Sequence, residues 1–220
     1  MQPEKHLLEL LDTHLKTGGT FVDIGAHAGY YSLYARDIVG EDGYIVMVEP
    51  NRVMHPIIES NFRQHDIDIN ADNDVLLYRA AASNDVTART FRSDYYSEAS
   101  RLLDADYVRG DSGHEYTILT STVDGMVTDA DFIKIDAEGE EYNILLGMDN
   151  LLTNSKPFLL IEIHHDQNVV LTDVVELLNQ YNYTCFGRKL DGELVSSGNI
   201  YERTKHMIAL HLKDGESCPY

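Results

Sequence analysis

Apolar residues along the chain fall into short runs that alternate with amphipathic stretches of helical spacing. The short runs predict buried parallel strands over residues 20–24, 44–49, 75–79, 132–136 and 158–164. The amphipathic stretches predict helices over residues 4–16, 30–39, 52–65, 140–152 and 172–181. Two further strands are expected to close the sheet, over residues 183–187 and 205–212. Strands that alternate with helices in this way predict a doubly wound α/β fold.

The alternation is interrupted over residues 86–122, which we interpret as an insertion lying across the active site. Residues 87–91 and 116–122 alternate polar and apolar positions like solvent-exposed strands, with a polar stretch between them. Residues 1–19 are expected to form a leading helix that covers the sheet or the mouth of the site. Because no linker or internal repeat divides the 220 residues, we expect a single domain over 1–220.

The segment Phe21-Val22-Asp23-Ile24 runs directly into the turn Gly25-Ala26-His27-Ala28-Gly29, and Glu49 ends the next strand. A strand, a tight glycine turn, a helix and then an acid is how a doubly wound sheet binds a nucleotide-like ligand, with the acid accepting the ribose hydroxyls. Asp23 stands where dinucleotide-binding turns usually carry an apolar residue, because a pyrophosphate is anionic. A carboxylate there suits an ammonium or sulfonium group, which indicates S-adenosylmethionine as the ligand.

The fourth and fifth predicted strands carry charged residues where buried parallel strands are normally aliphatic. Side-chain alternation puts Lys134, Asp136 and Glu138 on one face, and it does the same for Glu162 and His164. Since the two strands are expected to be neighbours, we predict an ion pair between Lys134 and Glu162. Asp136, Glu138 and His164 would then lie near the carboxyl ends of the strands, where ligands bind. A purely structural polar network stays open as the alternative.

Three ordered blocks of sequence resemble the FkbM-type S-adenosylmethionine-dependent methyltransferases. The blocks are Asp23-Ile24-Gly25-Ala26-His27-Ala28-Gly29-Tyr30-Tyr31-Ser32, Val48-Glu49-Pro50-Asn51 and Phe132-Ile133-Lys134-Ile135-Asp136-Ala137-Glu138-Gly139-Glu140-Glu141. The resemblance covers residues 20–165 and departs from the family at His27, where Asn is more usual. It implies a class I methyltransferase fold, Rossmann-like, with a mostly parallel seven-stranded sheet and a small antiparallel insertion. It also implies methyl transfer to a hydroxyl oxygen of a small molecule, sugar or lipid.

The resemblance and the chemistry of the side chains together predict a set of cofactor-binding residues. These are Asp23, Gly25, Ala26, Gly29, Glu49, Asn51, Ala81 and Ser83. Asp23 is expected beside the methionine amino group and Glu49 on the ribose. Asn51 is expected to border the adenosine pocket, and Ala81 and Ser83 to form the wall around the adenine.

Methyl transfer is an in-line displacement, so it depends on alignment, and a neutral hydroxyl needs a general base. Asp136, Glu138 and His164 are the candidate bases, and the sequence does not choose among them. With Glu162 they also offer ligand types for a divalent cation. Their spacing matches no dedicated metal motif, so no metal site is assigned from the sequence.

Two functions from other classes also remain open. A nucleotide-dependent oxidoreductase could use the same turn and the same acid, although Gly25-x-x-x-Gly29 is not the G-x-G-x-x-G pattern of such enzymes. A module that binds S-adenosylmethionine without catalysis would keep the cofactor residues alone. The charged ends of the fourth and fifth strands speak against this second alternative.

The charge of the chain is strongly negative. Its 37 acidic residues outnumber 17 basic residues, which leaves a formal net charge of −20. Such a charge repels nucleic acid and anionic membranes, so neither is expected as a partner. No apolar run approaches the ~18 residues of a membrane span, and no signal peptide is visible. Because Cys185 and Cys218 are too few for a disulfide framework, we expect a cytoplasmic enzyme of undetermined oligomeric state.

The excess of acidic residues predicts a source organism that lives at high salt. Molar salt shortens the range of charge repulsion to about 3 Å, which relieves the repulsion between like charges in the folded chain. We therefore expect the thermal unfolding midpoint to be higher in molar KCl than in dilute buffer. Calorimetric melts at both salt concentrations test this, and equal midpoints would contradict it.

Overall fold

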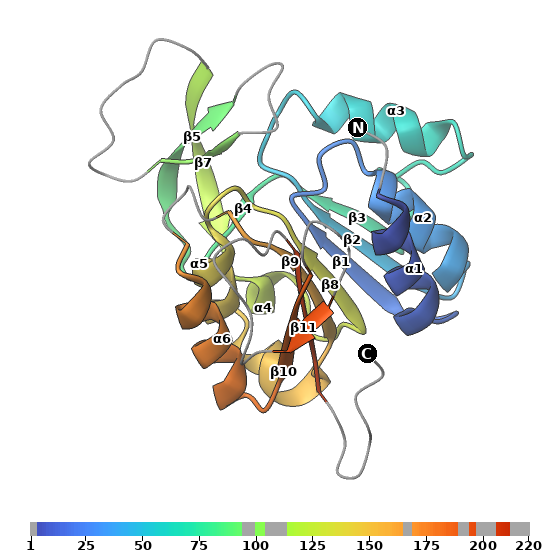
Figure 1. Ribbon diagram of the computed structural model, residues 1–220. Coiled ribbons are helices and arrows are strands. Elements are labelled where there is room, and N and C mark those ends of the chain that lie inside the picture. The colour runs from blue at the N-terminus through green and yellow to red at the C-terminus, as the bar shows by residue number, and fades with distance from the viewer. Residues whose placement is uncertain are drawn as a thin grey trace.

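The computed structural model describes residues 4–93, 100–103, 114–164, 169–188, 194–196 and 206–211. Within these residues, eight strands form the main sheet (Figure 1). In spatial order they are β11 (Leu194–Ser196), β10 (Thr184–Arg188), β12 (His206–Leu210), β9 (Phe158–Glu162), β8 (Phe132–Ile135), β1 (Thr20–Ile24), β2 (Tyr44–Val48) and β3 (Val75–Tyr78). The helices are α1 (Lys5–His14), α2 (Tyr30–Val39), α3 (His55–Arg63), α4 (Val123–Met126), α5 (Glu141–Leu146) and α6 (Leu171–Gln180).

The predicted parallel core is confirmed, but the strand count differs from the prediction. Strands β3, β2, β1, β8 and β9 pair in parallel, and β12, β10 and β11 then continue the sheet in antiparallel pairs. The sheet is therefore mixed, and β11 is an eighth strand beyond the seven that were expected. A strand of three residues is too short to produce a recognisable alternation, so the sequence pattern did not reveal it.

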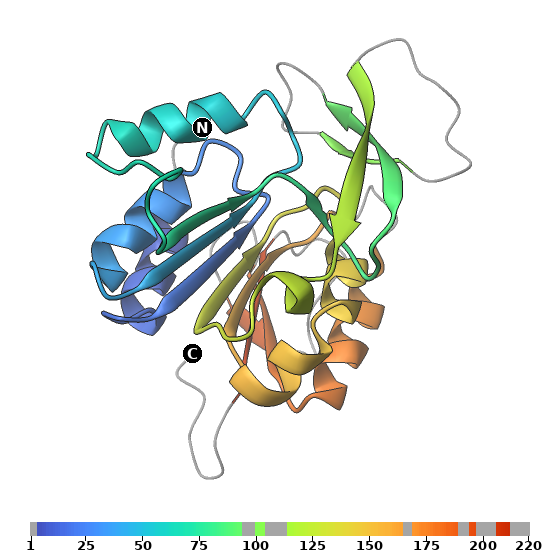
Figure 2. The same cartoon turned by 180° about the vertical axis from the view of Figure 1, so that it is seen from behind.

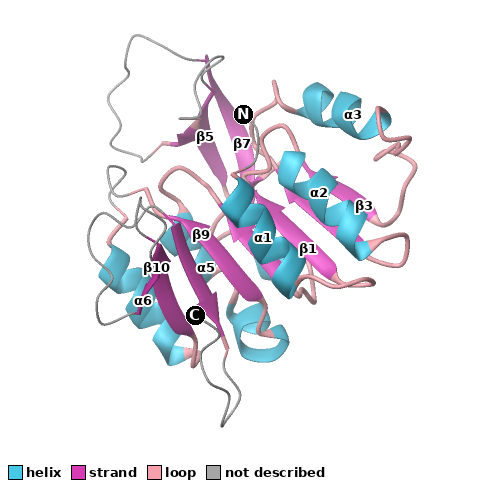
Figure 3. Cartoon of the chain, turned by 45° about the vertical axis from the view of Figure 1, so that its right-hand side comes forward, coloured by secondary structure: helices cyan, strands magenta, loops and turns pink. Residues whose placement is uncertain are grey.

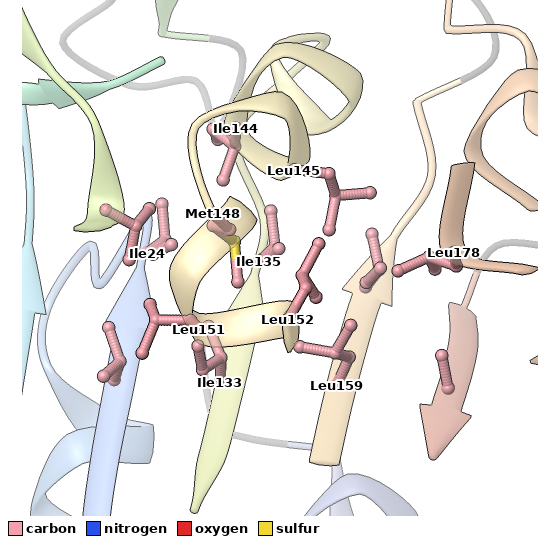
Figure 4. Close-up of a cluster of buried hydrophobic side chains, with 14 of the residues drawn as sticks. Ile24, Ile133, Ile135, Ile144, Leu145, Met148, Leu151, Leu152, Leu159 and Leu178 are labelled. Carbon is pink, nitrogen blue, oxygen red and sulfur yellow. The ribbon is translucent and has the colours of Figure 1, made fainter. Parts of the chain in front are cut away.

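Helices cover both faces of the main sheet (Figures 1 and 3). Side chains of a strand alternate between the faces, so Phe21 packs with α1, α2 and α3 while Val22 and Ile24 join the opposite cluster. Figure 4 shows that opposite cluster. Its labelled strand residues are Ile24, Ile133, Ile135 and Leu159, and those from the covering helices are Ile144, Leu145, Met148, Leu151, Leu152 and Leu178.

The predicted helix over 140–152 is interrupted. Helix α5 ends before Gly147, and a π-helical turn follows at Leu151–Ser155. A Cβ atom at Gly147 would overlap the carbonyl oxygen of Ser83, so the backbone here passes another chain segment closely. The carboxylate of Asp124 accepts the backbone N–H groups of Asn150 (2.7 Å) and Leu151 (3.1 Å) and so caps the new turn. Tertiary contacts therefore end one helical segment and begin the next.

The described part of the predicted insertion, together with Ala81–Ala82 before it, forms a small second sheet beyond the carboxyl ends of the parallel strands (Figure 2). Its strands are β4 (Ala81–Ala82), β7 (His114–Ser121), β5 (Ala88–Ser93) and β6 (Arg101–Leu102), in that order. Residues 94–99 and 104–113 of the predicted insertion, and Cys218, lie outside the described residues. Among the helices that are described, none combines the length and the apolar character needed to cross a membrane.

Candidate active site

A cavity lies at the carboxyl ends of β1, β2, β8 and β9, and it is partly covered by the small sheet. It encloses about 1360 Å³ of empty space, including space open to solvent. Because part of this space is open solvent, the cavity is an open cleft at the edge of the sheet. Many of the predicted site residues line its wall, namely Gly25, Ala26, Glu49, Asn51, Ala81, Asp136 and Glu138.

The turn after β1 needs glycine at its first position. Gly25 has φ +76°, a left-handed conformation that side chains other than glycine disfavour. A Cβ atom on Gly25 would also overlap the carbonyl oxygen of Asp136, which directly follows β8. The absence of a side chain thus allows the turn to pack against the end of β8. The predicted cofactor turn and Asp136, a predicted catalytic residue, are therefore in direct contact through their backbones.

Glu49 is held on the wall by both of its carboxylate oxygens. Oε2 accepts the backbone N–H of His27 at 2.7 Å, and Oε1 accepts that of Asn51 at 2.7 Å. Burial raises the pKa of Glu49 to about 7, although these two hydrogen bonds act in the opposite direction. His27 itself has φ +49°. Asn, Asp and His adopt this conformation more readily than most residues, which explains why His27 can stand where the family more often has Asn.

Asn51 connects this wall to the small sheet. It is buried, and its Oδ1 accepts a hydrogen bond from the Ser93 hydroxyl at 2.9 Å, while its Nδ2 donates to Ser100 Oγ at 3.2 Å. The next residue, Arg52, has its guanidinium 4.3 Å from the ring centre of Tyr116 on β7. These contacts fix the small sheet over the loop that follows β2.

Asp23, expected beside a ligand amino group, is not among the residues that line the cavity. Its side chain is completely buried, with Oδ2 accepting from the Ser32 hydroxyl at 2.7 Å and Oδ1 3.5 Å from Lys134 Nζ. Lys134 also lies 3.2 Å from Asp136 Oδ2. Burial alone would lower the pKa of Lys134, but Asp136 and Asp23 raise it above the ordinary value. The ammonium group of the chain's own lysine therefore neutralises Asp23.

The predicted ion pair between Lys134 and Glu162 is wrong. The register of β8 and β9 puts Lys134 opposite Leu160, so Glu162 lies two residues farther along its strand. The Lys134 ammonium group instead lies 3.2 Å from Asp136 Oδ2 and 3.5 Å from Asp23 Oδ1. Glu162 Oε2 instead lies 3.2 Å from Nε2 of His206 on β12.

His164 lies at the centre of a group of carboxylates. Its Nδ1 is 2.7 Å from Glu141 Oε1, and its Nε2 faces Glu138 at 3.6 Å, Glu162 at 3.7 Å and Asp136 at 3.8 Å. Burial lowers the pKa of His164, but the hydrogen bond to Glu141 and the nearby carboxylates raise it to about 9. Burial, together with the neighbouring carboxylates, raises the pKa of Glu138 to about 7. The cluster thus concentrates negative charge around one imidazole.

Four predicted site residues are not among those that line the cavity, namely Asp23, Gly29, Ser83 and His164. Gly29 caps the start of α2 with φ +76°, and a Cβ there would lie 3.0 Å from the ring of Phe62, so glycine also allows close packing at this position. Ser83 donates a hydrogen bond to Glu140 Oε1 at 2.6 Å. His164 contacts carboxylates that line the wall but is not itself part of it.

The cavity also includes residues that were not assigned to the site from the sequence. Among them are Leu7, Tyr31, Phe91, Arg101, Lys134 and His206. Tyr31 and Lys134 belong to the sequence blocks that resemble the FkbM family. A lysine within a buried strand could by itself have indicated a position in the functional site. His206 comes from β12, and no local pattern connects it to Glu162, which is 44 positions away.

Comparison with known proteins identifies the family. A sequence profile of the methyltransferase FkbM domain matches residues 23–185. The crystal structure of a methyltransferase FkbM from Methylobacillus flagellatus KT is similar, with a TM-score of 0.60 and 18% identity, covering 88% of this chain but 43% of the other. The chain thus spans less than half the length of that protein.

Two further solved structures share the fold over most of this chain. A putative rRNA-methylase from Clostridium thermocellum has a TM-score of 0.57 and 11% identity, covering 96% of each chain. Aeropyrum pernix fibrillarin in complex with S-adenosyl-L-methionine has a TM-score of 0.53 and 15% identity, covering 94% of this chain and 74% of the other. The profile match covers most of the sequence, and the chain belongs to the FkbM family of methyltransferases.

Proposed function

We propose that the chain transfers a methyl group from S-adenosylmethionine to a hydroxyl oxygen of a small-molecule, sugar or lipid acceptor. One observation carries this proposal. The carboxylate of Glu49 and the carboxylates of Asp136 and Glu138 line the same cavity. Glu49 offers acceptors for ribose hydroxyls, and the other two lie at the strand ends where a proton would be taken from the acceptor.

The residues of the wall fit this cofactor. Each oxygen of Glu49 accepts one backbone N–H and has a further lone pair for a ribose hydroxyl. Gly25 and Ala26 bring backbone close to the ligand, while Ala81 and Phe91 offer apolar surface for a planar base. S-adenosylmethionine supplies an electrophilic methyl group on a sulfonium sulfur.

We assign different tasks to the remaining predicted residues. Asp136 and Glu138 reach the cavity and are the candidate bases, whereas His164 is a positioning residue behind them. Asp23 is proposed to act through Lys134, holding its ammonium group beside Asp136. A base in contact with the cofactor turn keeps the acceptor oxygen close to the methyl carbon, which is what an in-line displacement requires.

The proposal is tested by binding and by transfer. Calorimetric titration should show binding of S-adenosylmethionine and S-adenosylhomocysteine but not of NAD. Methyl-labelled cofactor, offered with a panel of sugars, lipids and small alcohols, should label a hydroxyl oxygen. Binding of NAD alone would indicate an oxidoreductase, and cofactor binding without transfer to any acceptor would favour a non-catalytic module.

Changing Glu49 to Gln is expected to weaken S-adenosylmethionine binding about 100-fold, because two hydrogen bonds from ribose hydroxyls to a charged acceptor are weakened.

In the unaltered protein the affinity for S-adenosylmethionine should fall about tenfold per pH unit below pH 7, where the buried carboxyl of Glu49 takes up a proton, and level off above pH 7. Calorimetry between pH 5.5 and 8.5, values chosen roughly to bracket that pKa, measures both effects. The matched control is Glu41→Gln at an exposed position. Equal affinities for Glu49→Gln and Glu41→Gln would remove Glu49 from the cofactor site.

A further inference from the structure

The imidazole of His164 is oriented as the imidazole of a metal ligand usually is. Its Nδ1 is 2.7 Å from Glu141 Oε1, and Glu141 is completely buried. Histidines that bind metals commonly donate one ring N–H to a carboxylate, which leaves the other nitrogen aimed at the ion. Here the other nitrogen, Nε2, faces Asp136 Oδ1 and Glu138 Oε1.

The distances within this group suit a shared ion better than direct hydrogen bonds. Nε2 lies 3.6 Å from Glu138 Oε1 and 3.8 Å from Asp136 Oδ1, which is too long for a hydrogen bond. Ligands about 2.1 Å from an octahedral ion lie about 3 Å apart, so the three ligand atoms would move closer together on binding one ion. All three ligand atoms lie within 4.8 Å of one another.

An independent observation shows that the carboxylates have too few partners. Oε2 of Glu141 is buried and has no hydrogen-bond partner. The neighbouring carboxylates of Asp136 and Glu138 are faced by Lys134 and by His164. Lys134 is shared with buried Asp23, so the positive charge available within the described residues falls short of the negative charge.

We propose that Asp136, Glu138 and His164 bind one divalent transition-metal ion at the edge of the cavity. One imidazole nitrogen with carboxylate oxygens suits Mn²⁺ or a similar ion better than Ca²⁺, which prefers oxygen ligands alone. The ion would bind Nε2 of the neutral imidazole, because ligation requires an unprotonated nitrogen. Glu162, 3.7 Å from the same nitrogen, is placed to join the ligands.

The inference rests on the proposed function, since the ion would bind the acceptor hydroxyl and make it more acidic. The hydroxyl proton then passes to Asp136, the proposed base, at the carboxylate oxygen that does not bind the ion. The oxygen uses its electron pair to form the bond to the methyl carbon, and the carbon–sulfur bond breaks. Its electron pair stays on sulfur, which leaves a neutral thioether and a methyl ether.

Metal binding is measured without cofactor or acceptor, using Mn²⁺ alone. Electron paramagnetic resonance of free Mn²⁺, in about 0.3 M KCl to weaken surface binding, should reveal one tight site per chain. Glu138→Gln and His164→Ala are each expected to weaken that site at least tenfold, about the lower limit for losing a group that supports a metal. Thermal melts identify a variant that fails to fold. The Mn²⁺ affinity of the variant that does fold then tests the proposed site.

Two controls define the site. Glu176→Gln removes one exposed carboxylate from α6 and should leave the tight site unchanged. His6→Ala disrupts a second group of potential ligands, Glu4, His6 and His206, and should leave it unchanged too. The proposal is overturned if wild type shows no tight site, or if Glu138→Gln binds Mn²⁺ as wild type does. If the metal proposal is overturned in this way, methyl transfer that persists after chelation still supports the proposed function. Conversely, a tight Mn²⁺ site in a protein that does not bind the cofactor would refute only the proposed function.

Discussion

Asp136→Asn is expected to lower the turnover of methyl transfer about 10²–10⁴-fold, the range typical for loss of a general base. Asp136 lines the cavity, and its carbonyl oxygen lies against Gly25, so its carboxylate is close to the cofactor turn. An amide has nearly the same shape as a carboxylate but cannot take a proton at neutral pH. The affinity for S-adenosylmethionine should therefore stay within about threefold, well under 1 kcal/mol.

Single-turnover kinetics with saturating cofactor, together with calorimetry, separate turnover from binding for this variant. Asp149→Asn is the matched control, because Asp149 is exposed and far along the chain from the cavity wall, bonded to the Tyr181 hydroxyl at 2.8 Å. Normal turnover in Asp136→Asn would exclude Asp136 as the base and leave Glu138 as the candidate on the wall.

Gly25→Ala is expected to destabilise the protein by about 3–4 kcal/mol and to reduce cofactor binding below detection. Two causes add up. An alanine at φ +76° is strained, and its Cβ would overlap the carbonyl oxygen of Asp136, which forces the turn and the end of β8 apart. The shift would move the backbone that is meant to approach the cofactor.

Gly18→Ala separates these two causes, because Gly18 has φ +78° but open space around the position of a Cβ. It should cost only about 1–2 kcal/mol, from backbone strain alone, and leave cofactor binding unchanged. Denaturant unfolding measures the stabilities and calorimetry the binding. If the two alanine variants proved equally stable and bound cofactor equally well, the contact between Gly25 and Asp136 would have no energetic consequence.

Several parts of the site could be predicted because the information is local. Gly25 and Glu49 belong to a strand–turn–helix–strand unit whose order is written in consecutive residues, and both line the cavity. Asp136 and Glu138 were predicted from charges at the end of an apolar run, and they also line it. Such positions follow from alternation along a strand and from where parallel strands end.

Other predictions depended on distances between strands, and these were less successful. Pairing Lys134 with Glu162 required the register between β8 and β9, which shifts the partners by two residues. Asp23 is contacted by Ser32 from a helix and by Lys134 from another strand. Neither contact can be recognised from the position of Asp23 along its own strand. His164 was expected at the strand ends near the ligand; its ring is held by Glu141 against carboxylates that line the cavity, but it is not itself among the lining residues.

The sequence by itself determined the α/β architecture, the glycine turn, the acid that ends β2 and the family, since each is encoded by residues close together in the chain. Only the tertiary structure decided that β11 extends the sheet, that Asp23 is not among the residues that line the cavity and that one histidine faces three carboxylates. The physical reason is that register, burial and charge compensation arise between segments far apart in sequence, where neither periodicity nor spacing reports on contact.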